Sequence, residues 1–126
     1  MTKNFNLSEF ECNDGSKMPL EVYENVIKLA NQLQFLRDYT GRPITINSAY
    51  RSPEHNAKVG GSKTSQHLLG KAADITIQSL KPAEVFMIIE ELIDMGHMLQ
   101  GGLGLYDTFV HYDIRKSKAR WDYTKK

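Results

Sequence analysis

Residues 65–77 read Ser65-Gln-His67-Leu-Leu-Gly70-Lys-Ala-Ala-Asp74-Ile-Thr-Ile77, a polar loop that turns through a glycine into an apolar strand. The composition of residues 72–77 is typical of a β-strand. Asp74 is the exception in that strand, because an unpaired carboxylate among apolar residues is unfavourable and a bound cation would remove the penalty. If Gly70 reverses the chain, His67 and Asp74 converge and supply two donors of a metal site.

The segments on either side predict two amphipathic helices and further short strands. Apolar residues recur at three- and four-residue steps in both predicted helices. The predicted elements, in chain order, are a helix from Leu20 to Thr40-Gly41, a strand over 43–47, the strand over 72–77, a helix from Pro82 to Gly96, and a hairpin of strands 102–106 and 109–115 with a turn at Asp107-Thr108. These elements do not form repeating βαβ units. We therefore predict an α+β fold, with a small and mainly antiparallel sheet packed with two main helices.

The remaining segments carry fewer signals. Residues 48–66 are predicted to form a long polar loop, and loops of that length in compact domains are more often functional than idle. We interpret His55 as a structural residue of this loop, and Cys12 as a small buried apolar residue. Residues 1–18 form an irregular lead-in whose apolar residues dock on the body. The 126 residues suffice for one domain, 1–126, but not for two.

Composition excludes several classes of protein. Sixteen basic and fifteen acidic residues give a formal charge of +1. This charge lacks the excess of basic residues that is typical of proteins that bind nucleic acid. One cysteine permits neither an internal disulfide framework nor a cysteine-rich zinc site. No stretch approaches the ~18 consecutive apolar residues of a membrane helix, so no membrane insertion is expected. The first residues lack the apolar run of a secretory signal, and we expect synthesis in the cytoplasm without a signal peptide.

Three separated side chains could hold a zinc ion. Zn²⁺ accepts imidazole nitrogen and carboxylate oxygen, and a catalytic site keeps three protein ligands and one open position. His67 and Asp74 are two candidates, and His111, in another apolar strand, could complete the set. Asp113 would flank the same site, because strand residues two apart face one side. Ordinary alternatives stay open: a surface histidine at 67, an Asp74 ion pair with Lys71, and a half-buried core histidine at 111.

The motifs resemble those of the M15 peptidases. They comprise Ser65-x-His67-x-x-Gly70-x-Ala72-x-Asp74, the upstream Ser48-Ala-Tyr-Arg51-Ser, the downstream Val110-His111-x-Asp113, and the Arg120-Trp121 near the end. The M15 family contains zinc D-Ala-D-Ala carboxypeptidases and related peptidoglycan endopeptidases, and it shares its fold with the hedgehog signalling domain. The resemblance runs from about Glu21 to Trp121.

The resemblance implies a zinc metallopeptidase that hydrolyses peptidoglycan stem peptides, as a D-Ala-D-Ala carboxypeptidase or an L,D-endopeptidase. It implies a Zn²⁺ cofactor held by His67, Asp74 and His111. Arg51 matches the family arginine that binds the substrate carbonyl and steadies the oxyanion, and Ser65 matches a serine of the substrate pocket. We expect a monomer that acts at the cell wall or in the periplasm.

One position departs from the family pattern. Several branches carry an acidic general base three residues before the last histidine ligand, where this chain has Thr108. Asp113 is our first candidate for the base and Asp107 the second, while Asp113 could instead orient a ligand histidine. The departure favours an alternative function, a non-catalytic zinc-binding module related to the hedgehog domain. We interpret Trp121 and Tyr123 as core or rim packing, and the basic tail as a solvated surface.

Overall fold

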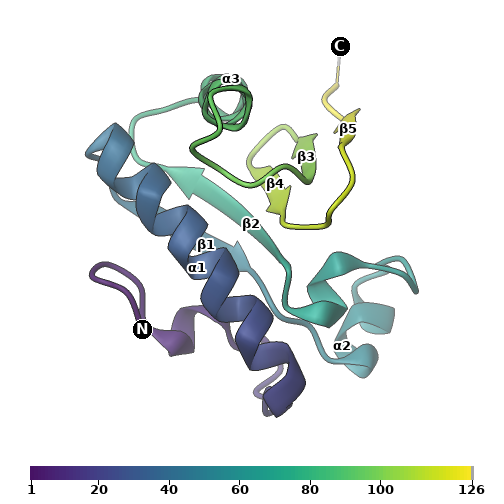
Figure 1. The fold of residues 1–126 in the computed structure, drawn as a ribbon. Helices are drawn as coiled ribbons and strands as arrows, with labels where there is room; N and C mark the ends of the chain where they lie inside the picture. The colour runs from purple at the N-terminus through teal and green to yellow at the C-terminus, as the bar shows by residue number, and fades with distance from the viewer. Residues whose placement is uncertain (126) are drawn as a thin grey trace.

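The computed structural model describes residues 1–125, and within them five strands form one sheet in the order β1-β2-β4-β3-β5 (Figure 1). The strands are β1 (Ile44–Ser48), β2 (Ala72–Ile77), β3 (Gly102–Leu105), β4 (Val110–Asp113) and β5 (Ala119–Asp122). Neighbouring strands run antiparallel except for β3 and β5, which are parallel. The predicted α+β fold with a mainly antiparallel sheet is confirmed.

The two long helices pack against this sheet. Helix α1 (Leu20–Thr40) lies across β1 and β2, and helix α3 (Pro82–Asp94) contacts β2, β3 and β4 (Figure 1). Helix α1 buries the stripe that the periodicity predicts, which consists of Val22, Val26, Leu29, Ala30, Leu33 and Leu36. Both helices end near the predicted positions, because Gly41 and Gly96 take left-handed φ values of 66° and 77° that suit glycine. None of the helices in residues 1–125 is long and apolar enough to cross a bilayer.

The lead-in docks on this body. Its short 3-10 helix, η1 (Leu7–Phe10), carries Phe10 into the core beside Phe5, and Cys12 is also buried. The amide of Tyr50 donates to the carbonyl of Phe10 at 3.1 Å. The lead-in is therefore bonded directly to the loop that follows β1.

Two segments contain more regular structure than the sequence patterns predict. The polar loop 48–66 contains helix α2 (Pro53–Lys58) and leads into a second 3-10 helix, η2 (Gln66–Leu69). Helix α2 has recognisable starting signals, because the Ser52 hydroxyl accepts the amide of His55 and Pro53 occupies the first turn. The basic tail adds strand β5, and Trp121 of β5 packs where a side chain at Gly104 would stand.

Candidate metal centre

Three protein segments bring His67, Asp74 and His111 together. His67 lies on η2, Asp74 on β2, and His111 directly opposite Asp74 on β4. Gly70 reverses the chain between His67 and Asp74 with a φ of 71°, and a Cβ atom there would collide with Val22 and Val26 of α1. The pairing register and this one turn therefore place all three side chains at one point.

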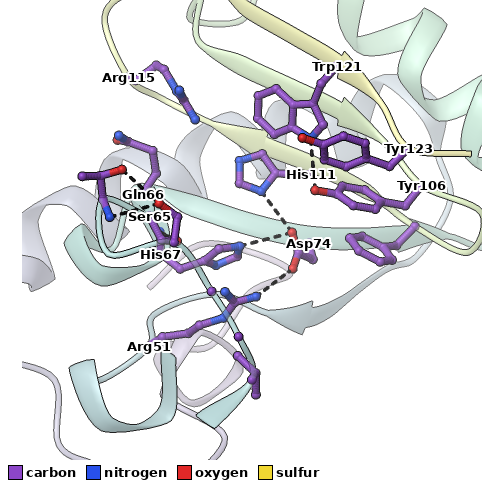
Figure 2. Close-up of a pocket in the computed structure, with 16 residues that line it drawn as sticks. Arg51, Ser65, Gln66, His67, Asp74, Tyr106, His111, Arg115, Trp121 and Tyr123 are labelled. Atoms are coloured by element: carbon purple, nitrogen blue, oxygen red, sulfur yellow. Dashed lines mark hydrogen bonds and ion pairs between the residues drawn. The ribbon is translucent and has the colours of Figure 1, made fainter. Parts of the chain in front are cut away.

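One nitrogen of each histidine points at Asp74 Oδ1 (Figure 2). His67 Nε2 lies 3.2 Å from this oxygen and His111 Nδ1 lies 3.1 Å from it. The three side chains are buried, with their ligand atoms all within 4.8 Å of one another. Two imidazoles and one carboxylate at such separations form a donor set that suits zinc.

Each histidine has an inner nitrogen that faces Asp74 and an outer nitrogen that faces away from it. The hydrogen bond made by the outer nitrogen determines which tautomer the ring adopts. His67 Nδ1–H donates to the carbonyl of Ala49 at 2.6 Å, and His111 Nε2–H donates to Asp113 Oδ2 at 2.7 Å. The inner nitrogen of each ring then presents a lone pair to Asp74 Oδ1 when the ring is neutral, and donates a second N–H to it when the ring is protonated. Lone pairs directed at one point repel one another unless a cation lies between them or the rings are protonated. Histidines that bind metals commonly make such outer hydrogen bonds.

Asp113 is fully buried behind His111. Its carboxylate accepts five hydrogen bonds, from His111 Nε2, Gly102 N, and the backbone N, Nε and Nη2 of Arg115. Arg115, which we expected in a solvated tail, is therefore part of the support of the site. The carboxylate of Asp113 lies on the far side of the His111 ring from Asp74, and its acceptor positions are occupied.

The pKa values in the metal-free site follow from these contacts. Burial alone would raise the pKa of Asp74 and of Asp113. Hydrogen bonds from His111 and His67 to Asp74, and from His111, Arg115 and Gly102 to Asp113, outweigh burial and hold both pKa values well below their usual range. Burial alone would lower the pKa of His111, but its bonds to Asp113 and Asp74 raise it. The metal-free centre therefore attracts positive charge, as a proton or as a metal ion.

Without metal, the free energy of unfolding should be highest between about pH 4 and about pH 6.5. The lowered pKa values of Asp74 and Asp113 give stability that is complete above their unfolded value and is lost as the pH falls. The raised pKa of His111 gives stability that is complete below its unfolded value and is lost as the pH rises. Urea denaturation with a chelator present would measure this dependence. A urea midpoint that rises steadily above about pH 6.5 would contradict it.

A pocket of about 620 Å³ opens over the centre, and the residues that line it include Arg51 and Ser65. Arg51 is held by three contacts, from Nη2 to Asp74 Oδ2 at 3.4 Å and from Nε and Nη1 to Ser48 and Asn56, each at 3.3 Å. The Ser65 hydroxyl accepts the amide of His67 at 3.2 Å and so begins η2. Both residues that the resemblance assigns to substrate thus border the pocket.

Asp107 does not join this group. It lies exposed in the turn between β3 and β4, where it accepts the amide of Lys125 at 3.1 Å, and it is not among the residues that line the pocket. Thr108 is exposed in the same turn. Asp74 is the one carboxylate that borders the pocket within residues 1–125.

Aromatic side chains form the wall of the pocket that faces Arg51 and Ser65 (Figure 2). Tyr106 and Phe109 stack with ring centroids 4.3 Å apart, and Trp121 Nε1 donates to the Tyr106 hydroxyl at 3.0 Å. Trp121 and Tyr123 line the pocket, whereas we expected them only in the core or rim packing. Sequence reasoning did not identify Tyr106 and Phe109 as pocket residues. The two-residue period of the predicted strand 109–115 held a signal for Phe109, which precedes His111 by two residues and directly precedes β4.

Comparisons with known proteins agree with this geometry. The family model for peptidase M15 matches residues 3–113. A zinc D-Ala-D-Ala carboxypeptidase from Streptomyces albus G is 35% identical over 78 residues, which cover 57% of this chain and 31% of the relative. The chain therefore spans about a third of the length of that curated relative.

Proposed function

The chain belongs to the peptidase M15 family, and from this membership we propose that it is a zinc metallopeptidase that hydrolyses peptide bonds in peptidoglycan stem peptides. The observation that carries the proposal is the convergence of His67 Nε2, His111 Nδ1 and Asp74 Oδ1 at the floor of a pocket. The name of the Streptomyces albus G relative supports a D-Ala-D-Ala carboxypeptidase, and an L,D-endopeptidase is the other specificity we consider. The substrate lies in the cell wall.

His67, Asp74 and His111, which all line the pocket, would hold the zinc ion as its three protein ligands. A zinc ion in this position would polarise the substrate carbonyl and bring the pKa of a coordinated water to about 7. The protein's part is to keep both imidazoles in the correct tautomer. Ala49 and Asp113 do so by accepting the outer N–H groups.

Arg51 would bind the substrate carbonyl oxygen and steady the negative charge that develops on it. A guanidinium has five N–H donors, and the three hydrogen bonds that Arg51 makes leave others for the substrate. Because these contacts hold the guanidinium in place beforehand, little reorganisation is needed as the charge appears. Ser65 and the aromatic wall of Tyr106 and Trp121 would bound the stem peptide on either side.

Asp113 acts in this proposal as a positioning residue for His111 and not as the general base. Its oxygens are occupied by His111, Arg115 and Gly102, so they have no free acceptor position for a proton from water. Asp107 stands in an exposed turn outside the pocket lining. Asp74 Oδ2 borders the pocket, but it accepts Arg51 Nη2 at 3.4 Å and the pKa of Asp74 is lowered, so Asp74 is a weak base.

A second candidate function is a zinc-binding module without hydrolytic activity. Two observations favour it. Asp74 is the single carboxylate that borders the pocket in the described part of the chain, and Thr108 occupies the position at which several branches of the M15 family carry an acidic residue. Purified protein incubated with peptidoglycan fragments distinguishes the two functions. Zinc-dependent release of D-Ala or of a cleaved peptide, detected by mass spectrometry, supports the peptidase. No release with any metal, at full zinc occupancy, supports the module.

Replacing Arg51 with alanine should lower kcat/KM by about 10²–10³-fold, the usual effect of removing one preorganised oxyanion donor. Zinc content should stay at the wild-type level, because Arg51 contacts Asp74 through Oδ2 and the histidines share Oδ1. Arg42→Ala is the matched control, since Arg42 is exposed after α1 and lies outside the pocket lining. An Arg51→Ala variant with unchanged kcat/KM and full zinc content would remove Arg51 from the mechanism.

A further inference from the structure

A second group of side chains of the types that bind metals lies outside the pocket. Cys12, Asp14 and His55 each offer one ligand atom, and these atoms all lie within 4.8 Å of one another. None of the three lines the pocket. Cys12 is buried, His55 is half-buried and Asp14 is exposed, so the group is anchored inside the protein and open to solvent on one side.

Ser52 brings the three residues together. Its amide donates to Cys12 Sγ at 3.3 Å, and its hydroxyl donates to Asp14 Oδ2 at 3.0 Å and accepts the amide of His55 at 3.1 Å. Ser52 is itself buried, with 3% of its surface exposed. Two residues of the lead-in and the first turn of α2 are thus held around one fixed side chain.

The chemistry of the group suits a zinc-class ion. Thiolate, imidazole and carboxylate are all zinc ligands, whereas magnesium and calcium take oxygen ligands alone. The His55 ring makes no hydrogen bond or ion pair with another residue of 1–125, so its nitrogens are free to coordinate. Water can occupy a fourth position from the open side.

We propose that Cys12, Asp14 and His55 form a second site for a zinc-class divalent ion, separate from the centre in the pocket. Its role is structural, because an ion there ties the lead-in to α2. Arg51 immediately precedes Ser52, and the hydrogen bond from the Tyr50 amide to the Phe10 carbonyl joins the lead-in to the loop just before α2. The ion therefore braces the loop that carries Arg51, whether or not the chain hydrolyses peptides.

Cobalt substitution tests the site, because Cys12 is the sole cysteine of the 126 residues. Sulfur-to-cobalt charge-transfer absorption in the near ultraviolet can then arise only from Cys12. We expect this absorption when the metal-free protein is titrated with Co²⁺ in a thiol-free reductant. It should persist in His67→Ala and disappear in Cys12→Ser. It should be lost or strongly weakened in His55→Ala, while His97→Ala, which changes an exposed histidine outside both groups, should match the wild type.

Metal content provides a second measurement that does not depend on the thiol. We expect two zinc ions per wild-type chain and one in His55→Ala, whose far-ultraviolet circular dichroism should match the wild type and so exclude misfolding. One ion per wild-type chain, lost entirely in His67→Ala, would overturn the proposal. So would a sulfur-to-cobalt absorption that is absent from the wild type, or one that His55→Ala and Asp14→Asn leave unchanged, since the thiol would then bind cobalt without the other two residues.

Discussion

Replacing His67 with alanine should lower the hydrolysis of peptidoglycan peptides by on the order of 10³-fold, because the metal's several kcal/mol of transition-state stabilisation are lost. His67 supplies one of three ligand atoms, and its ring is oriented by Ala49 before any metal binds. Zinc should leave the pocket site in this variant. Release of D-Ala or of cleaved peptide, measured beside zinc content, would show both effects.

The matched control is His97→Ala, because His97 is an exposed histidine that stacks on Phe35 and does not line the pocket. It should retain full activity and zinc content. Asp74→Ala should repeat the loss seen in His67→Ala, since both histidines share Asp74 Oδ1. Wild-type hydrolysis in a His67→Ala protein that has lost its pocket zinc would contradict the proposed metal mechanism.

Replacing Asp113 with asparagine should weaken zinc binding by about 10–100-fold, the usual effect of losing a group that orients a ligand histidine. The free energy of unfolding should fall by about 1–3 kcal/mol, because a buried hydrogen-bonding group loses its partner. An amide has one acceptor oxygen, and it cannot accept from His111, from Gly102 and from the three N–H groups of Arg115 as the carboxylate does. Chelator competition and urea denaturation would measure the two effects.

The same variant separates the two roles considered for Asp113. A positioning role predicts weaker zinc binding, with hydrolysis restored in part by excess zinc. A general-base role predicts normal zinc affinity and a loss of hydrolysis that zinc does not restore. Asp107→Asn is the control for a carboxylate in the turn, and we expect wild-type zinc affinity and activity from it, because Asp107 does not line the pocket. Lost hydrolysis in Asp107→Asn would instead identify Asp107 as the base.

Much of the fold could be predicted because its signals are local. Helices α1 and α3 have apolar residues at helical spacing and glycines just after their ends. For each helix, one continuous stretch of sequence therefore contains both the spacing that predicts the helix and the residue that ends it. The hairpin of β3 and β4 likewise turns at Asp107 and Thr108 as predicted, with the amide of Tyr106 bonded to the carbonyl of Phe109. Strand β5 escaped prediction because it pairs in parallel with β3, and these two neighbouring strands of the sheet are not consecutive along the chain.

By itself, the sequence determined the candidate ligands His67, Asp74 and His111, the need for a turn at Gly70, and the helices that support them. What surrounds those ligands became visible only in the folded chain. The fold places Asp113 with Arg115 behind His111, Tyr106 and Trp121 around the pocket, and Cys12 beside His55. The physical reason is that spacing along the chain determines which side chains share a strand or helix face. The hydrogen-bond partner of each polar atom depends instead on how distant segments pack together. This packing is set by the register of the strands and by the close contacts that glycines such as Gly104 permit.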